Sequence, residues 1–178
     1  VHVDIKSRGD MWGAKFMQYM LEMPEYGAYT RINTVLKSDS KCTPATYIDQ
    51  TKAVDYRGMI VLDGPLENNT YRKCRKAAID FFNGPDNADG KQCMLLINTW
   101  RFREGISLHG VYSTHMIGYI ASRAYLIQAA YRGIRNCSHR HTPYIPGIGW
   151  NINIRMYAPT FQGSEVTGIG VYDLMDAT

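Results

Sequence analysis

Stretches that suit a buried β-strand alternate irregularly along this sequence with stretches that suit an amphipathic helix. Two short apolar runs, residues 59–62 and 93–101, are typical of strands covered on both faces. Between them, residues 71–82 place apolar side chains at helical spacing behind Asn69 or Thr70, either of which can cap a helix. Elements of both kinds bury their apolar sides by packing together, so the pattern predicts an α+β fold.

Weaker patterns complete the predicted architecture. Further strands are expected at residues 1–6, 29–36, 108–112, 150–157 and 166–172, the last two as an antiparallel pair, and further helices at 11–23, 44–53 and 114–135. With 178 residues, the chain has the length of a single domain spanning residues 1–178. We expect a mixed or antiparallel sheet with two or three packed helices. An all-β sandwich with long helical insertions is the alternative, and it gains weight if residues 114–135 are only partly helical.

Composition excludes two classes of protein. Hydrophobic residues make up 45% of the chain and charged residues 20%, which excludes an intrinsically disordered protein. The longest stretch without a formal charge, residues 105–122, contains His109, His115 and several glycines, so we expect no membrane span. No signal-peptide pattern opens the sequence, but its first residue is Val1, so a processed amino terminus stays open and no compartment is assigned.

The net charge of +4 conceals an uneven distribution. Residues 1–90 carry 12 basic and 12 acidic side chains, whereas residues 91–155 carry eight basic side chains against Glu104 alone. Seven of those eight are arginine, whose planar guanidinium can bind a phosphate with two hydrogen bonds. The central segment therefore predicts an anionic partner.

Several arginines stand beside aromatic or imidazole rings. This occurs at residues 100–103, 131–135 and 139–144, and a fourth basic cluster occupies residues 71–76 on a predicted helix. Proteins that bind single-stranded nucleic acid use cations for the backbone and rings for the bases. The predicted nucleic-acid-binding residues are Arg72, Lys73, Arg75, Lys76, Arg101, Arg103, Arg132, Arg135 and Arg140. The alternative is that they form ordinary solvated faces, or face an anionic membrane, a polysaccharide or an acidic protein.

These patterns predict a non-enzymatic binding or assembly protein, of coat or nucleoprotein type, that contacts nucleic acid and forms homo-oligomers. The chain is rich in Tyr, Trp, Met and Arg, which are enriched at interfaces. It contains no Walker loop, no G-x-S-x-G and no G-x-G-x-x-G sequence. We therefore expect no cofactor and favour a protein without catalytic activity.

Two patterns support other chemistries. Asp4 and Lys6 match the D-x-K half of a Mg²⁺-dependent nuclease pattern, with Asp63 as the second carboxylate, although its position after Asp4 reverses the usual order. A chance match is the favoured interpretation. Cys137, His139 and His141 could supply three zinc ligands, but polar histidines in a basic loop are the simpler interpretation.

A third hypothesis is a secreted binding domain with disulfides and with glycans at Asn68 and Asn136. The four cysteines are Cys42, Cys74, Cys93 and Cys137, and none of them forms a C-x-x-C pair. Free cysteines are commonly buried, so buried thiols are favoured, and all three disulfide pairings stay open.

Overall fold

The computed structural model describes residues 2–3, 14–36, 42–45, 56–62, 69–99, 105–117, 122–135 and 137–157. The α-helices in these ranges are α1 (Ala14–Glu22), α2 (Asn69–Phe82) and α3 (Arg123–Ala130), and the short 3-10 helices are η1 (Pro24–Tyr26), η2 (Pro85–Asn87) and η4 (Tyr131–Gly133). The strands are β1 (His2–Val3), β2 (Thr30–Arg31), β3 (Asn33–Leu36), β4 (Cys42–Ala45), β5 (Gly58–Leu62), β6 (Leu95–Thr99), β7 (Ser113–Ile117) and β8 (Asn153–Tyr157).

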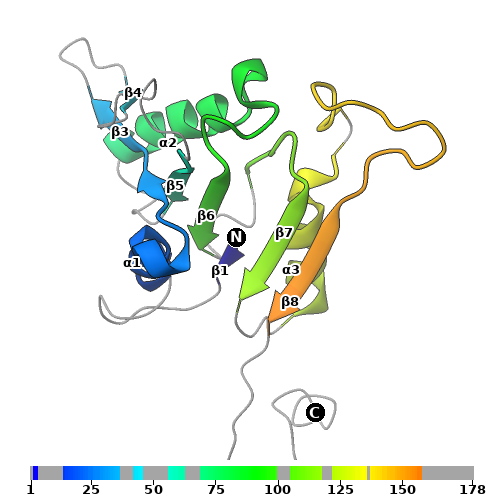
Figure 1. The fold of residues 1–178 in the computed structure, drawn as a ribbon, viewed down its shortest axis with the longest axis horizontal. Coiled ribbons are helices and arrows are strands. Elements are labelled where there is room, and N and C mark those ends of the chain that lie inside the picture. The colour runs from blue at the N-terminus through cyan, green and yellow to red at the C-terminus, as the bar shows by residue number, and fades with distance from the viewer. Residues whose placement is uncertain are drawn as a thin grey trace, which may run out of the picture.

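Six strands form one sheet in the order β2-β5-β6-β1-β7-β8, and every neighbouring pair in it is parallel. The other two strands, β3 and β4, form an antiparallel pair. Helices and both kinds of strand pairing confirm the predicted α+β class. The main sheet itself is parallel, which the sequence did not predict, because apolar runs do not encode strand direction. Parallel neighbours need a crossover, and α2 lies on the one from β5 to β6 and α3 on the one from β7 to β8, whereas α1 connects β1 to the more distant β2 (Figure 1).

Strands β5 and β6 are covered on both faces. Met59 and Val61 of β5 pack with Ala14 of α1, whereas Ile60 and Leu62 pack with Ala78 of α2. Side chains alternate along a strand, so α1 and α2 lie on opposite faces of the sheet (Figure 1). All five residues of β5 are buried, which confirms the strand predicted at residues 59–62.

The second half of the sheet corrects a predicted helix. Residues 113–117 form β7, whereas the sequence predicted a helix over residues 114–135. Among the described residues of that range, the helical ones belong to α3 and η4. Met116 of β7 packs against Ala129 and Ala130 of α3. Over five residues, alternation and helical spacing are hard to distinguish, and pairing of β7 with both β1 and β8 fixes the strand.

Other predicted boundaries also change. The strand expected at residues 29–36 divides at buried Ile32 into β2 of the main sheet and β3 of the hairpin. The strand expected at residues 108–112 is irregular, and the expected helix at 44–53 begins inside β4. Strand β8 pairs in parallel with β7. Its predicted antiparallel partner, residues 166–172, lies outside the described residues.

One disulfide joins the hairpin to α2. Cys42 of β4 is bonded to Cys74 of α2, so the favoured interpretation of free thiols is wrong for these two residues. Closing a loop with a sequence separation of 32 stabilises the fold by about 4 kcal/mol in the chain-entropy account. Cys93 is buried and in no disulfide, and burial raises its pKa to about 12, whereas Cys137 is exposed. In the described ranges, no helix has the length and apolarity needed to cross a membrane.

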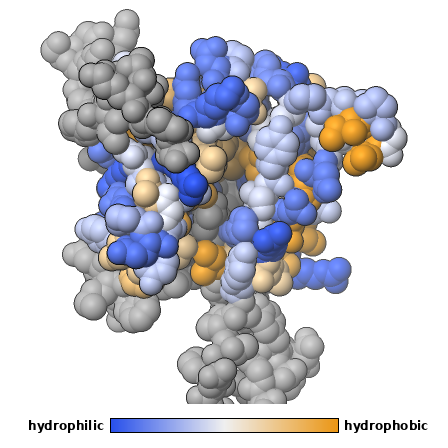
Figure 2. Space-filling model, viewed as in Figure 1, coloured by the Kyte–Doolittle hydropathy of each residue, from blue (hydrophilic) through white to orange (hydrophobic). Residues whose placement is uncertain are grey.

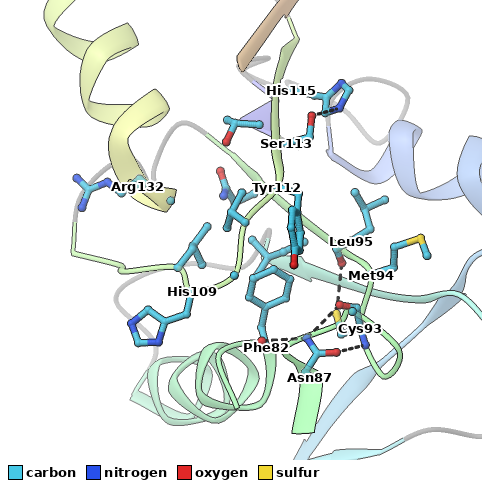
Figure 3. A pocket seen from close by; sticks show the side chains of 18 of the residues that line it. Phe82, Asn87, Cys93, Met94, Leu95, His109, Tyr112, Ser113, His115 and Arg132 are labelled. Atoms are coloured by element: carbon cyan, nitrogen blue, oxygen red, sulfur yellow. Dashed lines mark hydrogen bonds between the residues drawn. The ribbon is translucent and has the colours of Figure 1, made fainter. Parts of the chain in front are cut away.

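A buried asparagine fixes the end of α2 against the start of β6. Asn87 Nδ2 donates to the Phe82 and Cys93 carbonyls, and its Oδ1 accepts from the Cys93 amide (Figure 3). The same Oδ1 also accepts from the Gln92 amide. All four bonds are between 2.7 and 3.1 Å long. One side chain therefore satisfies four backbone groups at the turn that leads from α2 into the sheet.

Asn87→Ala is expected to lower the free energy of unfolding by about 3 kcal/mol, because it leaves several of these backbone groups unpaired. Urea unfolding measures the change. Asn153→Ala, at an exposed position of β8, is the matched control and should stay within about 0.5 kcal/mol of the parent. An equal loss in both variants would contradict the role of Asn87.

Candidate nucleic-acid interface

A basic groove of about 790 Å³ lies between α2 and the segment 105–109. We call it the α2 groove. The residues that line it are Arg72, Lys73, Arg75, Lys76, Ile79, Asp80, Asn83, Gly105, Ile106, Ser107 and His109. Four of them are the cations predicted at residues 71–76, which we call the α2 cluster. The structure therefore places this predicted cluster along one wall of a concave surface.

The buried side of α2 explains why its cations face outward. Cys74 is tied to β4 by the disulfide, and Ala78, one turn later, is buried against the sheet. These two residues fix the rotation of the helix. Arg72, Lys73 and Lys76 are consequently exposed, as the sequence predicted from the apolar stripe of this helix.

Residues 105–109 form the opposite wall of the groove, and buried and partly exposed side chains alternate along them. Ile106 and Leu108 are buried in the same core as α2, so Ser107 and His109 between and beyond them reach the groove. Asn83, just after α2, donates from Nδ2 to the Ser107 carbonyl at 2.8 Å and accepts from the His109 amide at 2.8 Å. The two walls are therefore joined directly by hydrogen bonds.

Two further predicted arginines reach this surface from the segment after α3. Arg135 Nη1 donates to Ser107 Oγ at 2.8 Å, which places its exposed guanidinium beside the groove. Arg140 is exposed, and its charge contributes to lowering the pKa of His109. Basic residues of α2 and of the segment after α3, two regions far apart in the sequence, thus converge around residues 105–109.

His109 lies at the centre of this convergence. Partial burial lowers its pKa below 6.5, and the nearby Arg140, His141 and His139 lower it further. Its imidazole is therefore neutral at pH 7. Nδ1 of the ring is buried and has no hydrogen-bond partner among the described residues. No pattern in the sequence marked His109 as a binding residue, and only the alternating burial from Ile106 onward turns it toward the groove.

Arg132 has a different position from the other predicted binding residues. Its side chain is buried, and its Nη1 donates to the Ile106 carbonyl at 3.0 Å. This bond connects η4 to the buried edge of the groove wall, so we assign Arg132 a positioning role. Arg101 and Arg103 lie outside the described residues, and their place relative to the groove stays a prediction.

The nuclease residues Asp4, Lys6 and Asp63 also lie outside the described residues. The strands that precede them, β1 and β5, are both paired in parallel with β6, which lies between them. Neighbouring strands are about 4.8 Å apart, so β1 and β5 are separated by roughly 10 Å. The nuclease hypothesis stays a prediction.

The zinc hypothesis is not supported by the geometry of its three residues. His139 is buried, with Nε2 hydrogen-bonded to the Gly133 carbonyl at 3.0 Å, and Cys137 is exposed. His141 accepts a hydrogen bond from Arg140 Nε at its Nε2. Within the described residues, no group of three His, Cys, Asp or Glu side chains is arranged to hold a metal ion.

A second cavity, of about 390 Å³, lies between β6 and β7 (Figure 3). At its edge, Ser113 Oγ lies 2.8 Å from His115 Nε2, and His115 Nδ1 lies 2.9 Å from the Tyr157 hydroxyl. Burial lowers the pKa of His115, and the charge of Arg155 contributes. The three groups pair with one another and join β7 to β8, so we assign them a structural role.

No protein-family model, curated protein or solved structure matches this sequence. The functional assignment consequently depends on the chemistry of the α2 groove and its surroundings.

The contrast between Arg132 and Arg135 can be tested by mutation. Arg132→Ala is expected to lower the free energy of unfolding by about 2–4 kcal/mol, because it removes a buried, charge-assisted hydrogen bond and leaves a cavity. Arg135→Ala, at an exposed position, should change it by less than about 1 kcal/mol. Urea unfolding followed by tryptophan fluorescence compares the two. Equal stability of the two variants would contradict a positioning role for Arg132.

Proposed function

We propose that this protein binds nucleic acid by holding the phosphate backbone in the α2 groove. The observation that carries the proposal is the convergence of the α2 cluster, Arg135 and Arg140 on one concave surface. Cations drawn from separate parts of a chain create a local positive potential that the net charge of +4 does not reveal. Phosphate contacts of this kind supply most of the affinity of proteins for nucleic acid.

The dimensions of the groove suit a polyanion. Arg72 and Lys76 are four residues apart, which corresponds to about 6 Å along a helix axis. Phosphates of one B-DNA strand rise about 3.4 Å each, so this turn alone spans about two of them. Asp80 lies in the same groove and pairs with Lys76 at 2.6 Å, which reduces the local positive charge without reversing it.

The arginines provide geometry as well as charge. Arg135 is held by Ser107, and a guanidinium fixed at one end loses less side-chain entropy when it binds a phosphate. His109 adds a group that can become cationic beside the same surface. Self-assembly of coat or nucleoprotein type stays a prediction from the sequence and is no part of this proposal.

Binding to oligonucleotides tests the proposal. The triple variant R72A/K73A/K76A should weaken the affinity for a 16-nucleotide single strand at least tenfold in 100 mM salt, because three phosphate contacts are lost. The slope of log K against log salt should become shallower by about 2, since each contact on a single strand contributes about 0.7. Fluorescence anisotropy at several salt concentrations measures both quantities.

The matched control is R57A/R123A/R155A, which removes the same net charge from three exposed arginines away from the groove. It should retain most of the affinity. Equal weakening by both triple variants would show a general charge effect and contradict binding in the groove. Absence of binding by the parent protein in 50 mM salt would overturn the proposal.

Adding Mg²⁺ to the same samples tests the nuclease hypothesis. That hypothesis requires cleavage of the oligonucleotide, and Asp4→Ala should abolish the cleavage.

The lowered pKa of His109 predicts a pH dependence. A bound phosphate favours the imidazolium, so binding takes up a proton, and affinity should rise as pH falls through 6.5 toward the lowered pKa of the free protein. His109→Gln should flatten this rise, as measured by anisotropy between pH 5.5 and 8.

The stability of the protein also depends on His109. The pKa of this histidine is higher in the unfolded chain than in the folded one, so the stability that it contributes is present above about pH 6.5 and is lost below it. Unfolding is therefore measured over the same pH range as a control. A pH profile that His109→Gln leaves unchanged would contradict the role of His109.

A further inference from the structure

The loop that follows the groove carries a stack of rings. Trp150 stacks on His139 with ring centroids 5.8 Å apart and an interplanar angle of 22°. Tyr144 meets Trp150 edge to face, with centroids 5.2 Å apart and an angle of 76°. We call His139, Tyr144 and Trp150 the ring platform. Its members lie up to eleven positions apart in the sequence, and the fold of the loop brings them into contact.

Hydrogen bonds within the loop and to η4 fix the position of the ring platform. His139 is anchored to the Gly133 carbonyl of η4, and Thr142 Oγ1 donates to the His139 carbonyl at 2.8 Å. Trp150 Nε1 donates to the Thr142 carbonyl at 3.2 Å. The polar edge of the indole is therefore satisfied within the loop, which leaves an apolar ring surface for contact with a ligand.

The platform is open to solvent despite this order. Tyr144 is 59% exposed and Trp150 is 48% exposed, and beside them Ile148 at the tip of the loop is 69% exposed. Figure 2 shows hydrophobic residues at the tip of the protruding loop, at the upper right, and Figure 1 shows the same loop in orange. A concentration of exposed rings and aliphatic groups on an ordered loop indicates a contact surface.

Arg140 and one backbone hydrogen bond connect the platform to the α2 groove. Arg140 and His141, between His139 and Tyr144 in sequence, are both exposed. The charge of Arg140 acts on His109, and His109 lines the groove. The Gly110 amide, next to His109, also donates to the Ser138 carbonyl, next to His139, at 2.8 Å. The loop that carries the rings therefore lies against the wall of the groove, and Arg140 adds a positive charge there. This combination complements a ligand that is anionic along its backbone and has flat apolar faces beside it.

We propose that the ring platform stacks bases of a single-stranded nucleic acid whose phosphates lie in the α2 groove. The inference rests on the proposed function and specifies its substrate class. In a duplex, the bases stack on one another and their faces are not available to a protein. In a single strand they can stack on Tyr144 or Trp150, and this contact tolerates any sequence because every base has an aromatic face. Arg140, next to the rings, can hold the phosphate of the same nucleotide.

An abasic strand separates base contacts from phosphate contacts. Parent protein is titrated with a 16-nucleotide strand, with an abasic strand of equal length that keeps every phosphate, and with a 16-base-pair duplex. We expect the parent to bind the base-containing strand at least tenfold more tightly than the abasic strand. We also expect it to prefer that strand to the duplex. Tyr144→Ala should weaken binding of the base-containing strand by roughly tenfold, the loss of one stacked base, and leave abasic binding unchanged.

Three further measurements sharpen the comparison. Tyr144→Phe keeps the ring and should bind as the parent does. Tyr26→Ala, which removes an equally exposed tyrosine from η1, should change neither affinity. Because stacking is uncharged, Tyr144→Ala should also leave the salt slope unchanged, whereas the α2 triple variant makes it shallower.

The outcomes distinguish this inference from the proposed function. If R72A/K73A/K76A weakens both strands while Tyr144→Ala weakens neither, phosphate binding stands and base stacking is overturned. Equal binding of base-containing and abasic strands by the parent would overturn base stacking and assign the rings to another partner, such as a protein. Binding of the duplex as tight as that of the single strand would overturn it as well. If no strand binds at all, both proposals fail.

Discussion

Burial of β5 and β6 on both faces is the constraint on which the rest of the structure depends. Neighbouring residues of β5 enter opposite cores, so a helix must cover each face, and α1 and α2 supply that cover. Packing of Ala78 into the sheet and the bond from Cys74 to β4 then fix the rotation of α2. The basic side chains of α2 have no place in an apolar core and consequently face the groove. The candidate site is thus a result of how the core is closed.

The segment 105–109 links this core to the basic segment after α3. Its apolar residues belong to the core of α2, its carbonyls accept bonds from Asn83 and Arg132, and its Ser107 hydroxyl binds Arg135. Two arginines only three residues apart therefore have different roles. Arg132 stabilises the wall of the groove from inside, whereas Arg135 presents its charge at the surface. Burial separates them, because a buried guanidinium needs its hydrogen-bond partners within the protein.

Much of the fold could be predicted from local patterns, but the sheet could not. The runs at residues 59–62 and 93–101 and the apolar stripe of α2 identified the correct elements, because burial on both faces or on one stripe leaves a distinct periodicity. The same reasoning began a helix at Thr114 and so extended it over residues 114–117 of β7. A segment this short fits either periodicity, and pairing with β1 and β8 makes it a strand. Of the candidate site, the exposed cations of α2 could be predicted, whereas Ser107, His109 and Asn83 lacked any distinguishing pattern.

The sequence by itself determined which stretches are apolar enough to be buried, which face of α2 is basic, and that arginine dominates residues 91–155. These properties depend only on the types of residues that are close together in the sequence. Only the tertiary structure decided that the main sheet is parallel, that Cys42 pairs with Cys74, and that the basic residues of α2 and of the segment after α3 meet around residues 105–109. It also decided that Arg132 is buried while Arg135 and Arg140 are exposed. Such outcomes depend on contacts between residues far apart in the chain. Local periodicity is compatible with several strand orders, disulfide pairings and side-chain positions, and packing and hydrogen bonding select one of them.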